Sequence, residues 1–151
     1  MPRPSADAWT DPDCPVARTL DLVGDRWSLL VVRDAMDGAR SFTEFQRRTG
    51  IARNILSDRL RKLGAHGLLT QRTAPTGRRL EYVLTDRGRD LFPVLLALRQ
   101  WGERNAFEPG EPHSTLVDER GVRVPDVAPT GTDGTPLTAD STRVRKTGGS
   151  R

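Results

Sequence analysis

Apolar residues recur at helical spacing near the start of the chain and predict two short helices. The first places Val16, Leu20 and Val23 on one face, and the second spans residues 27–36. A glycine follows each pattern, at positions 24 and 38. Because glycine commonly stands just beyond a helix end, these positions are expected to end the two helices.

Two more helices are predicted next, and a start signal precedes the first of them. Ser41 and Glu44 have the spacing of a capping box, in which the serine oxygen accepts from the backbone N–H of the glutamate and the glutamate reaches back. This third helix is expected to stop at Gly50. The fourth is expected from Arg53 to about Gly64, and it keeps three leucines on one face: Leu56, Leu60 and Leu63.

The pattern then changes from helical to alternating. Residues 68–72 and 80–84 predict two strands, and the turn between them contains Gly77 and ends in Arg78 and Arg79. Thr85 is expected to cap a last helix that reaches residue 101, and Pro93 should kink this helix or separate its first turn. The predicted fold class is mainly α with a small β-wing (α+β), a winged helix-turn-helix with extra N- and C-terminal helices.

Composition divides the chain into three parts. Residues 1–13 form a polar arm, residues 14–105 hold the helices and the wing, and residues 106–151 are rich in glycine and proline. Within the last part, residues 116–124 are expected to form a small hairpin and residues 143–145 a further strand. Hydrophobic residues make up only 35% of the chain, so part of it is expected to lie outside the core.

Positive charge is concentrated in one stretch of the chain. The net charge is +4, yet residues 40–90 contain twelve Arg and Lys and only five Asp and Glu. Such a surplus is typical of a surface that binds an anionic partner, and equally of a solvated arginine-rich face.

Other classes of protein are disfavoured by what the sequence lacks. One cysteine and two histidines do not supply a metal site built from those ligands, and no apolar run approaches the ~20 residues of a membrane helix. No nucleophile–base pair, phosphate-binding glycine loop or carboxylate pair stands out. We therefore expect a cytoplasmic protein that is not an enzyme and needs no metal or cofactor.

The fourth helix and the wing carry the candidate DNA contacts. An α-helix fits the major groove, where Asn reads adenine, Arg reads guanine and Asp accepts from cytosine. The candidates on the helix are Arg53, Asn54, Ser57, Asp58, Arg61 and Lys62, and those for the phosphate backbone are Arg47, Arg48, Arg72, Arg78 and Arg79. For Asp58, a surface ion pair with Lys62 four residues on is the alternative interpretation.

Several segments resemble the HxlR-type regulators, a MarR-like branch of bacterial winged-helix proteins. The matching segments are Cys14-Pro-Val, residues 21–27 (DLVGDRW), 29–34, 42–45, 55–60 and 82–88 (YVLTDRG), and Trp101-Gly102. The resemblance runs from about Cys14 to Glu103. It implies a homodimeric transcription factor that binds a palindromic operator in double-stranded DNA. The family builds its dimer from the first and last helices, which here carry Val16, Leu20, Val23, Leu91, Val94, Leu95, Leu98 and Trp101.

The resemblance also makes Cys14 a candidate redox sensor. Some members of the family sense oxidants or electrophiles through an N-terminal cysteine, and others keep the cysteine without known redox chemistry. A small-molecule effector is the other candidate. The alternative function is a winged helix used only for protein–protein contact, for which the exposed face of the fourth helix should be apolar rather than polar and basic.

Overall fold

A computed structural model describes residues 8–146 of the chain. The chain divides into two compact units, residues 1–95 and residues 96–151. The N-terminal seven residues of the predicted arm lie outside the described residues.

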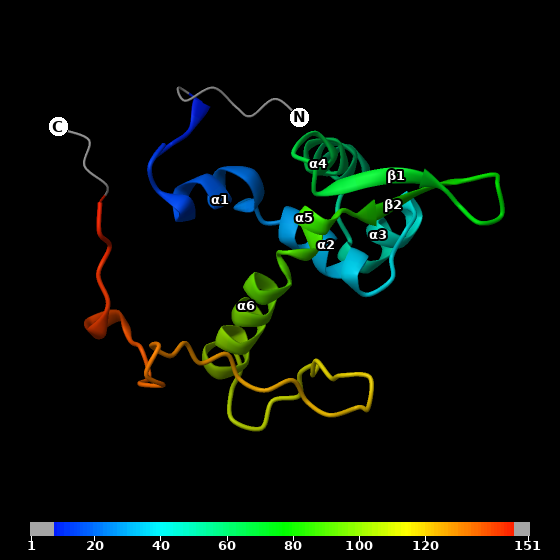
Figure 1. The fold of residues 1–151 in the computed structure, drawn as a ribbon. Coiled ribbons are helices and arrows are strands. Elements are labelled where there is room, and N and C mark those ends of the chain that lie inside the picture. Colours follow the sequence, from blue (N-terminus) through cyan, green and yellow to red (C-terminus); the bar gives the residue numbers. More distant parts are fainter. Residues whose placement is uncertain (1–7, 147–151) are drawn as a thin grey trace. The chain divides into compact units, whose positions relative to one another are not determined.

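The first unit opens with four helices, all at the predicted places (Figure 1): α1 (Pro15–Val23), α2 (Ser28–Met36), α3 (Phe42–Thr49) and α4 (Arg53–Ala65). The predicted capping box at the start of α3 is present. The side chain of Ser41 accepts from the N–H of Glu44 at 3.2 Å, and the Glu44 carboxylate accepts from the N–H of Ser41 at 3.0 Å. Gly50 ends α3 with φ of 69°, a left-handed conformation that glycine adopts without a steric cost.

Two antiparallel strands, β1 (Leu69–Thr73) and β2 (Leu80–Leu84), follow α4. The first begins one residue later than predicted, because the N–H of Leu68 still bonds to the carbonyl of Leu63 at 2.9 Å and closes the end of α4. Leu80 lies on the same face as Leu84, but Leu80 is 60% exposed whereas Leu84 is buried. The hairpin therefore extends beyond the core toward its turn.

The last predicted helix is divided into α5 (Asp86–Arg89) and α6 (Phe92–Asn105). The hydroxyl of Thr85 accepts from the N–H of Gly88 at 3.1 Å and so caps α5. Pro93 is the second residue of α6, where the backbone N–H has no partner within the helix. The predicted separation of the first turn is confirmed.

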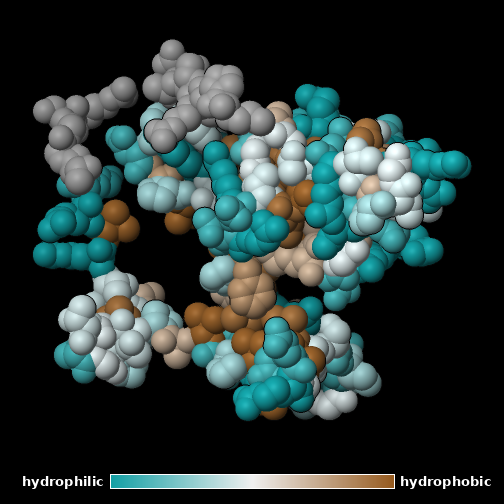
Figure 2. Space-filling view, turned by 45° about the vertical axis from the view of Figure 1, so that its right-hand side comes forward, coloured by the Kyte–Doolittle hydropathy of each residue, from teal (hydrophilic) through white to brown (hydrophobic). Residues whose placement is uncertain are grey.

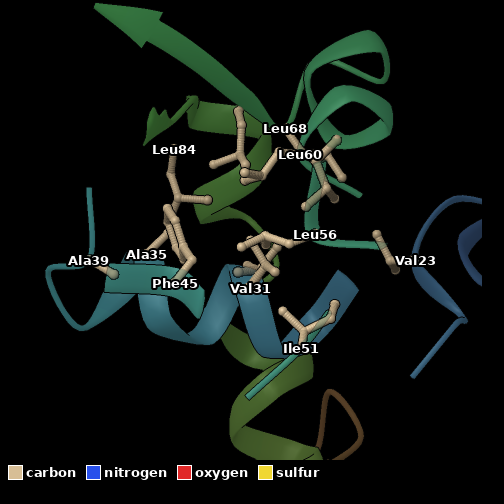
Figure 3. Close-up of a cluster of buried hydrophobic side chains, with 13 residues drawn as sticks. Val23, Val31, Ala35, Ala39, Phe45, Ile51, Leu56, Leu60, Leu68 and Leu84 are labelled. Carbon is tan, nitrogen blue, oxygen red and sulfur yellow. The ribbon is translucent and has the colours of Figure 1, made fainter. Parts of the chain in front are cut away.

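The core of the first unit lies between the helices and the base of the hairpin (Figure 3). It joins Val31 and Ala35 of α2, Phe45 of α3, Leu56 of α4 and Leu84 of β2, all of which are buried. Three helices around a common apolar centre, with a two-stranded hairpin after the third, form a winged helix-turn-helix of the α+β class, as predicted.

In the second unit the C-terminal segment bonds to the second half of α6. The buried side chain of Gln100 donates to the carbonyl of Pro125 at 2.9 Å and accepts from the N–H of Val127 at 2.6 Å. Arg123 pairs with Glu103 at 3.0 Å. These contacts join the second half of α6 to the C-terminal segment, and the compact unit that contains both begins at Leu96.

The rest of this unit consists of short turns. An antiparallel bridge joins Val117 and Arg123 where the sequence predicts a hairpin, and a second joins Thr130 and Pro136. A 3-10 turn, η2, covers Ala139–Ser141. The strand expected at residues 143–145 is wrong: Val144 is 87% exposed, and no described segment pairs with it.

Candidate nucleic-acid interface

Helix α4 divides its side chains between the core and the solvent. Leu56, Leu60 and Leu63 are buried, with at most 3% of each residue exposed. The opposite face is open to solvent and carries most of the predicted contacts: Arg53, Asn54, Ser57, Arg61 and Lys62. This division is what a helix needs in order to pack on its own domain and enter a groove with its outer face.

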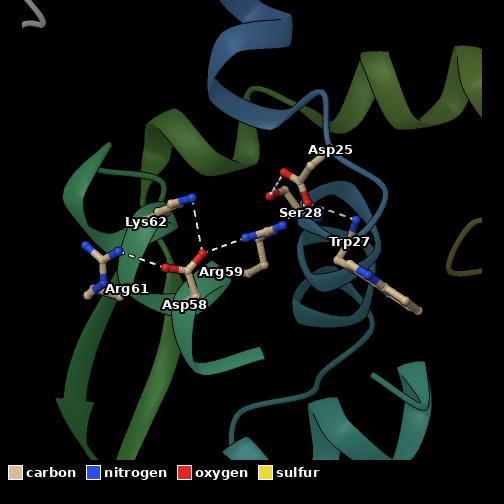
Figure 4. Close-up of polar contacts among 7 residues, drawn as sticks. All are labelled: Asp25, Trp27, Ser28, Asp58, Arg59, Arg61 and Lys62. Atoms are coloured by element: carbon tan, nitrogen blue, oxygen red, sulfur yellow. Dashed lines mark hydrogen bonds and ion pairs between the residues drawn. The ribbon is translucent and has the colours of Figure 1, made fainter. Parts of the chain in front are cut away.

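Asp58 is occupied by side chains of its own helix. Its carboxylate accepts from Arg61 at 2.8 Å and pairs with Lys62 at 3.2 Å (Figure 4). Hydrogen bonds from Arg61 and Lys62 hold the pKa of Asp58 below its ordinary value. The geometry therefore favours the ion-pair interpretation of Asp58 over a contact to cytosine.

The β1–β2 turn presents two arginines to solvent. Gly77 has φ of 76°, and the N–H of Ala74 bonds to the carbonyl of Arg79 at 2.7 Å, which closes the turn. Arg78 and Arg79 are both exposed and make no ion pair within the described residues. Arg72, by contrast, lies opposite Glu81 in the ladder and pairs with it at 3.2 Å.

The end of α3 supplies one unpaired and one paired arginine. Arg47 is exposed and makes no ion pair in the part of the chain that the structure describes. Arg48 pairs with the carboxylate of Asp37 at 3.0 Å. Among residues 8–146, Arg47, Arg78 and Arg79 thus have no ion-pair partner, whereas Arg48 and Arg72 each have one.

A cleft of about 430 Å³ lies between the exposed face of α4 and the hairpin. Its lining residues are Ser57, Leu60, Arg61, Gly64, Leu69, Thr70, Gln71 and Tyr82. Gln71 and Tyr82 are directly paired across the two strands, and sequence reasoning did not select them. The signal that could have found them is the two-residue period, which puts both on the strand face that also carries the buried Leu69 and Leu84.

Two further residues that sequence reasoning missed connect α4 to α2. The carboxylate of Asp25 accepts from the N–H groups of Trp27 at 3.0 Å and Ser28 at 3.1 Å, and from the Ser28 hydroxyl. It also pairs with the guanidinium of Arg59 at 2.7 Å. Partial burial raises the pKa of Asp25, but hydrogen bonds, chiefly from Ser28 and Arg59, outweigh it and bring the pKa to about 2.

The predicted dimer residues divide into an exposed and a covered group. Val16 and Leu20 on α1 and Leu98 and Trp101 on α6 are each more than half exposed, and Val94 is 40% exposed. Figure 2 shows apolar side chains open at the surface among hydrophilic ones. Val23 is buried in the core, and Leu91 and Leu95 pack against that core. Val23 therefore stabilises the single chain, whereas Leu91 and Leu95 are only partly buried and the other predicted residues are open to solvent.

Cys14 is the N-cap of α1 and is half-buried. Its sulfur accepts from the N–H of Ala17 at 3.4 Å. The segment before it is held to the same helix, because Thr10 donates to Asp21 from its N–H at 2.9 Å and from its hydroxyl at 2.7 Å. Arg18 also stacks over the ring of Trp9, with 4.9 Å between the guanidinium carbon and the ring centre.

The described residues contain no helix long and apolar enough to cross a membrane. Over the same range, 8–146, no three His, Cys, Asp or Glu side chains gather in a cluster that could hold a metal ion.

Comparison with known proteins finds a family that matches this chain. The family described as HxlR-like helix-turn-helix matches residues 22–109. An HTH-type transcriptional regulator of Mycobacterium tuberculosis, Rv3095, is 44% identical over 98 residues, which are 64% of this chain and 62% of that protein. The match therefore spans less than two thirds of the relative's length.

Two solved structures show the same fold. PA1607, described as a candidate transcription factor, is 50% identical with a TM-score of 0.84, covering 89% of this chain and 95% of that one. The redox regulator HypR in its reduced form is 35% identical with a TM-score of 0.57, covering 62% of this chain and 94% of that one.

The relatives carry the names of transcription factors and regulators. The family match covers more than half of the chain and includes the four helices from α2 to α5 with the hairpin, as well as α6. The resemblance read from the sequence motifs is thereby confirmed, and the chain belongs to the HxlR-like helix-turn-helix family.

Proposed function

We propose that this chain is a transcriptional regulator that binds double-stranded DNA as a homodimer, with α4 in the major groove and the β1–β2 turn at the phosphate backbone. The observation that carries the proposal is the open polar face of α4 next to a hairpin whose turn exposes Arg78 and Arg79, neither of which pairs with a carboxylate of the described part of the chain. A helix ~10–12 Å wide fits the ~12 Å major groove. A face that docks a protein would be apolar, and this one is not.

The side chains divide into base-reading and backbone contacts. Asn54 and Ser57 are exposed near the N-terminal end of α4, where recognition helices contact base edges, and Arg61 follows on the same face. Arg47 and the two turn arginines are suited to phosphates, which position the protein without reading sequence. Asp58 is left out of the base-reading set because Arg61 and Lys62 already occupy its carboxylate.

A second copy of the chain is the partner proposed for the exposed apolar residues. Val94, Leu98 and Trp101 recur at helical spacing on α6, and Val16 and Leu20 are exposed on α1. A two-fold dimer would present two α4 helices to half-sites of a palindromic operator, separated by one or more turns of ~34–36 Å.

Selection of binding sites from random double-stranded DNA tests this function. The selected site and a scrambled duplex would then be compared by fluorescence anisotropy at several salt concentrations. If a dimer neutralises ~8 phosphates, log K should fall with log salt at a slope of about −7. Arg78→Ala and Arg79→Ala should weaken binding to both duplexes, whereas Asn54→Ala should relax base preference at one position. Equal affinity for both duplexes near physiological salt would refute the proposal.

Oxidants or electrophiles acting on Cys14 are the proposed effectors. The thiol caps α1, a helix that the proposal places at the dimer interface, and the likeness to a redox regulator supports this choice. With one cysteine in the chain, the products are a disulfide between two subunits, a mixed disulfide with a small thiol, or an alkylated thiol. Operator affinity would be measured before and after diamide or quinone treatment, for the native chain and for Cys14→Ser. Unchanged affinity in the treated native chain would direct the search to small-molecule effectors.

A further inference from the structure

The N-terminus of α2 holds a carboxylate in a fixed place. Asp25 accepts from two successive backbone N–H groups, those of Trp27 and Ser28, and from the Ser28 hydroxyl. These donors belong to the first residues of α2, whose Val31 and Ala35 are buried in the core. The position of the Asp25 carboxylate is therefore set by the backbone of the domain.

Arg59 extends from α4 to that carboxylate and at the same time to Asp58. Its Nε donates to Asp25 Oδ2 at 2.7 Å, and its Nη1 donates to Asp58 Oδ2 at 2.5 Å (Figure 4). Only 22% of its side chain is exposed, so this is among the more sheltered ion pairs of the first unit. The guanidinium is planar, and two carboxylates on different edges fix its orientation in a way that a lysine ammonium does not reproduce.

Asp58, held in place by Arg59, also pairs with two cations of the surface proposed to face DNA. One oxygen pairs with Arg61 at 2.8 Å and the other with Lys62 at 3.2 Å. The side chains of these two residues are 69% and 51% exposed, so without Asp58 both long side chains would sample many rotamers. The same negative charge lies where it opposes a phosphate that approaches either cation.

We infer that Arg59 is a positioning residue of the DNA-binding face, because it ties Asp58 to the N-terminus of α2. Asp58 in turn holds the side chains of Arg61 and Lys62 in the orientation that one DNA geometry requires. Its negative charge also weakens the attraction of these two cations to phosphates in general. The inference rests on the proposed function, because it concerns the selectivity of the same surface. Arg59 itself touches no base in this scheme and acts through Asp58.

The test compares two substitutions of Arg59 that differ in charge. Arg59→Gln removes the charge and the bridge, whereas Arg59→Lys keeps the charge but cannot bond both carboxylates in the same plane. Each variant is titrated against the selected site and the scrambled duplex, and the ratio of the two affinities is the readout. Arg89→Gln is the matched control, because Arg89 makes an exposed pair with Asp86 at 3.3 Å on α5, outside the proposed face.

We expect the affinity ratio to fall about fivefold to tenfold in both Arg59 variants, a loss comparable to one good base contact. The ratio should stay unchanged in Arg89→Gln. Asp58→Asn should bind the scrambled duplex more tightly than the native chain and also lose selectivity. All titrations are made at a temperature at which circular dichroism shows each variant to be folded, and Arg59→Lys carries the test if Arg59→Gln does not fold.

A native affinity ratio in Arg59→Lys would overturn the inference, since charge alone would then suffice. An unchanged affinity for scrambled DNA in Asp58→Asn would overturn the part assigned to Asp58. If the native chain itself does not distinguish the two duplexes, the proposed function fails, and this result is distinct from a failure confined to the variants.

Discussion

Replacement of Gly88 by alanine should strongly destabilise the domain, because a methyl group at this position has no room. An added Cβ would lie 2.2 Å from the carbonyl oxygen of Leu68 and 2.9 Å from a methyl carbon of Leu84. The leucine methyl can rotate away. The carbonyl cannot move freely, because it accepts from the N–H of Thr85 at 3.1 Å. Helix α5 must therefore shift by about 1 Å to restore an ordinary carbon–oxygen contact of ~3.3 Å.

The size of the effect follows from these contacts. Overpacking of a tight site costs typically 1–3 kcal/mol, and strained hydrogen bonds at Thr85 add about 0.5–1.5 kcal/mol. The higher helix propensity of alanine returns about 1 kcal/mol. Together these terms give a net loss of about 0.5–3.5 kcal/mol in the free energy of unfolding. Because the overlap is with a hydrogen-bonded carbonyl, we expect the upper part of this range, about 2–3 kcal/mol, which for a domain of this size lowers Tm by roughly 10–20 °C.

The measurement is unfolding by heat and by urea, monitored by circular dichroism. Gly64→Ala is the control, since its Cβ would meet only the carbonyl oxygen of Leu69, at an ordinary 3.9 Å, within the same domain. That variant should be as stable as the native chain or slightly more stable. If the Tm of Gly88→Ala lies within about 2 °C of the Tm values of the native chain and of Gly64→Ala, the contact between α5 and the base of the hairpin is not rigid and the reasoning is wrong.

Two further predictions use the same unfolding measurements, and a third adds sedimentation. Leu63→Ala, which empties a fully buried position, should cost about 2–5 kcal/mol, whereas Leu80→Ala at 60% exposure should stay within about 0.5 kcal/mol of the native chain. Asp25 has a pKa of about 2 in the fold against the ordinary 3.8, so its carboxylate stabilises the fold above pH ~4, and this contribution is lost as pH falls toward 2. Asp25→Asn should keep many of the hydrogen bonds to the N-terminus of α2. It should lose about 1 kcal/mol of that acid-dependent stability, a figure reduced for the partial exposure of the carboxyl. Leu98→Glu should leave Tm within a few degrees, because the residue is 52% exposed, but should convert a sedimenting dimer into a monomer; a native chain that sediments as a monomer at micromolar concentration would contradict the dimer.

Local signals in the sequence were sufficient for most of the fold. The Ser41–Glu44 capping box, the leucines of α4 and the turn at Gly77 each act within a few residues, and the structure has all three where they were expected. Pro93 likewise marked the place where the last helix is divided. These features depend on backbone geometry and side-chain period, which a single sequence contains.

Contacts between distant segments could not be read in the same way. The pair between Asp25 and Arg59 joins positions 34 residues apart, and nothing local distinguishes it from other surface charges. An apolar stripe has the same pattern whether its own domain or a second chain covers it. The sequence pattern therefore places Val23 on one face with Val16 and Leu20, although in the structure Val23 is buried and the other two are exposed.

The charges of the hairpin also bear on solubility. The ladder of a two-stranded sheet leaves backbone groups along both edges, and of these the N–H of Tyr82 bonds to the carbonyl of Arg40 at 2.8 Å. Exposed strand edges can pair with strands of other molecules and start aggregation. Here Arg72, Glu81 and the two turn arginines place charge along this exposed ribbon, which is a common protection against edge-to-edge association. Neutral variants of the turn would lose this protection together with the phosphate contacts that we propose for Arg78 and Arg79. Lysine substitutions of Arg78 and Arg79 keep the charge and therefore this protection. If such a variant binds DNA weakly, the weak binding is not caused by self-association.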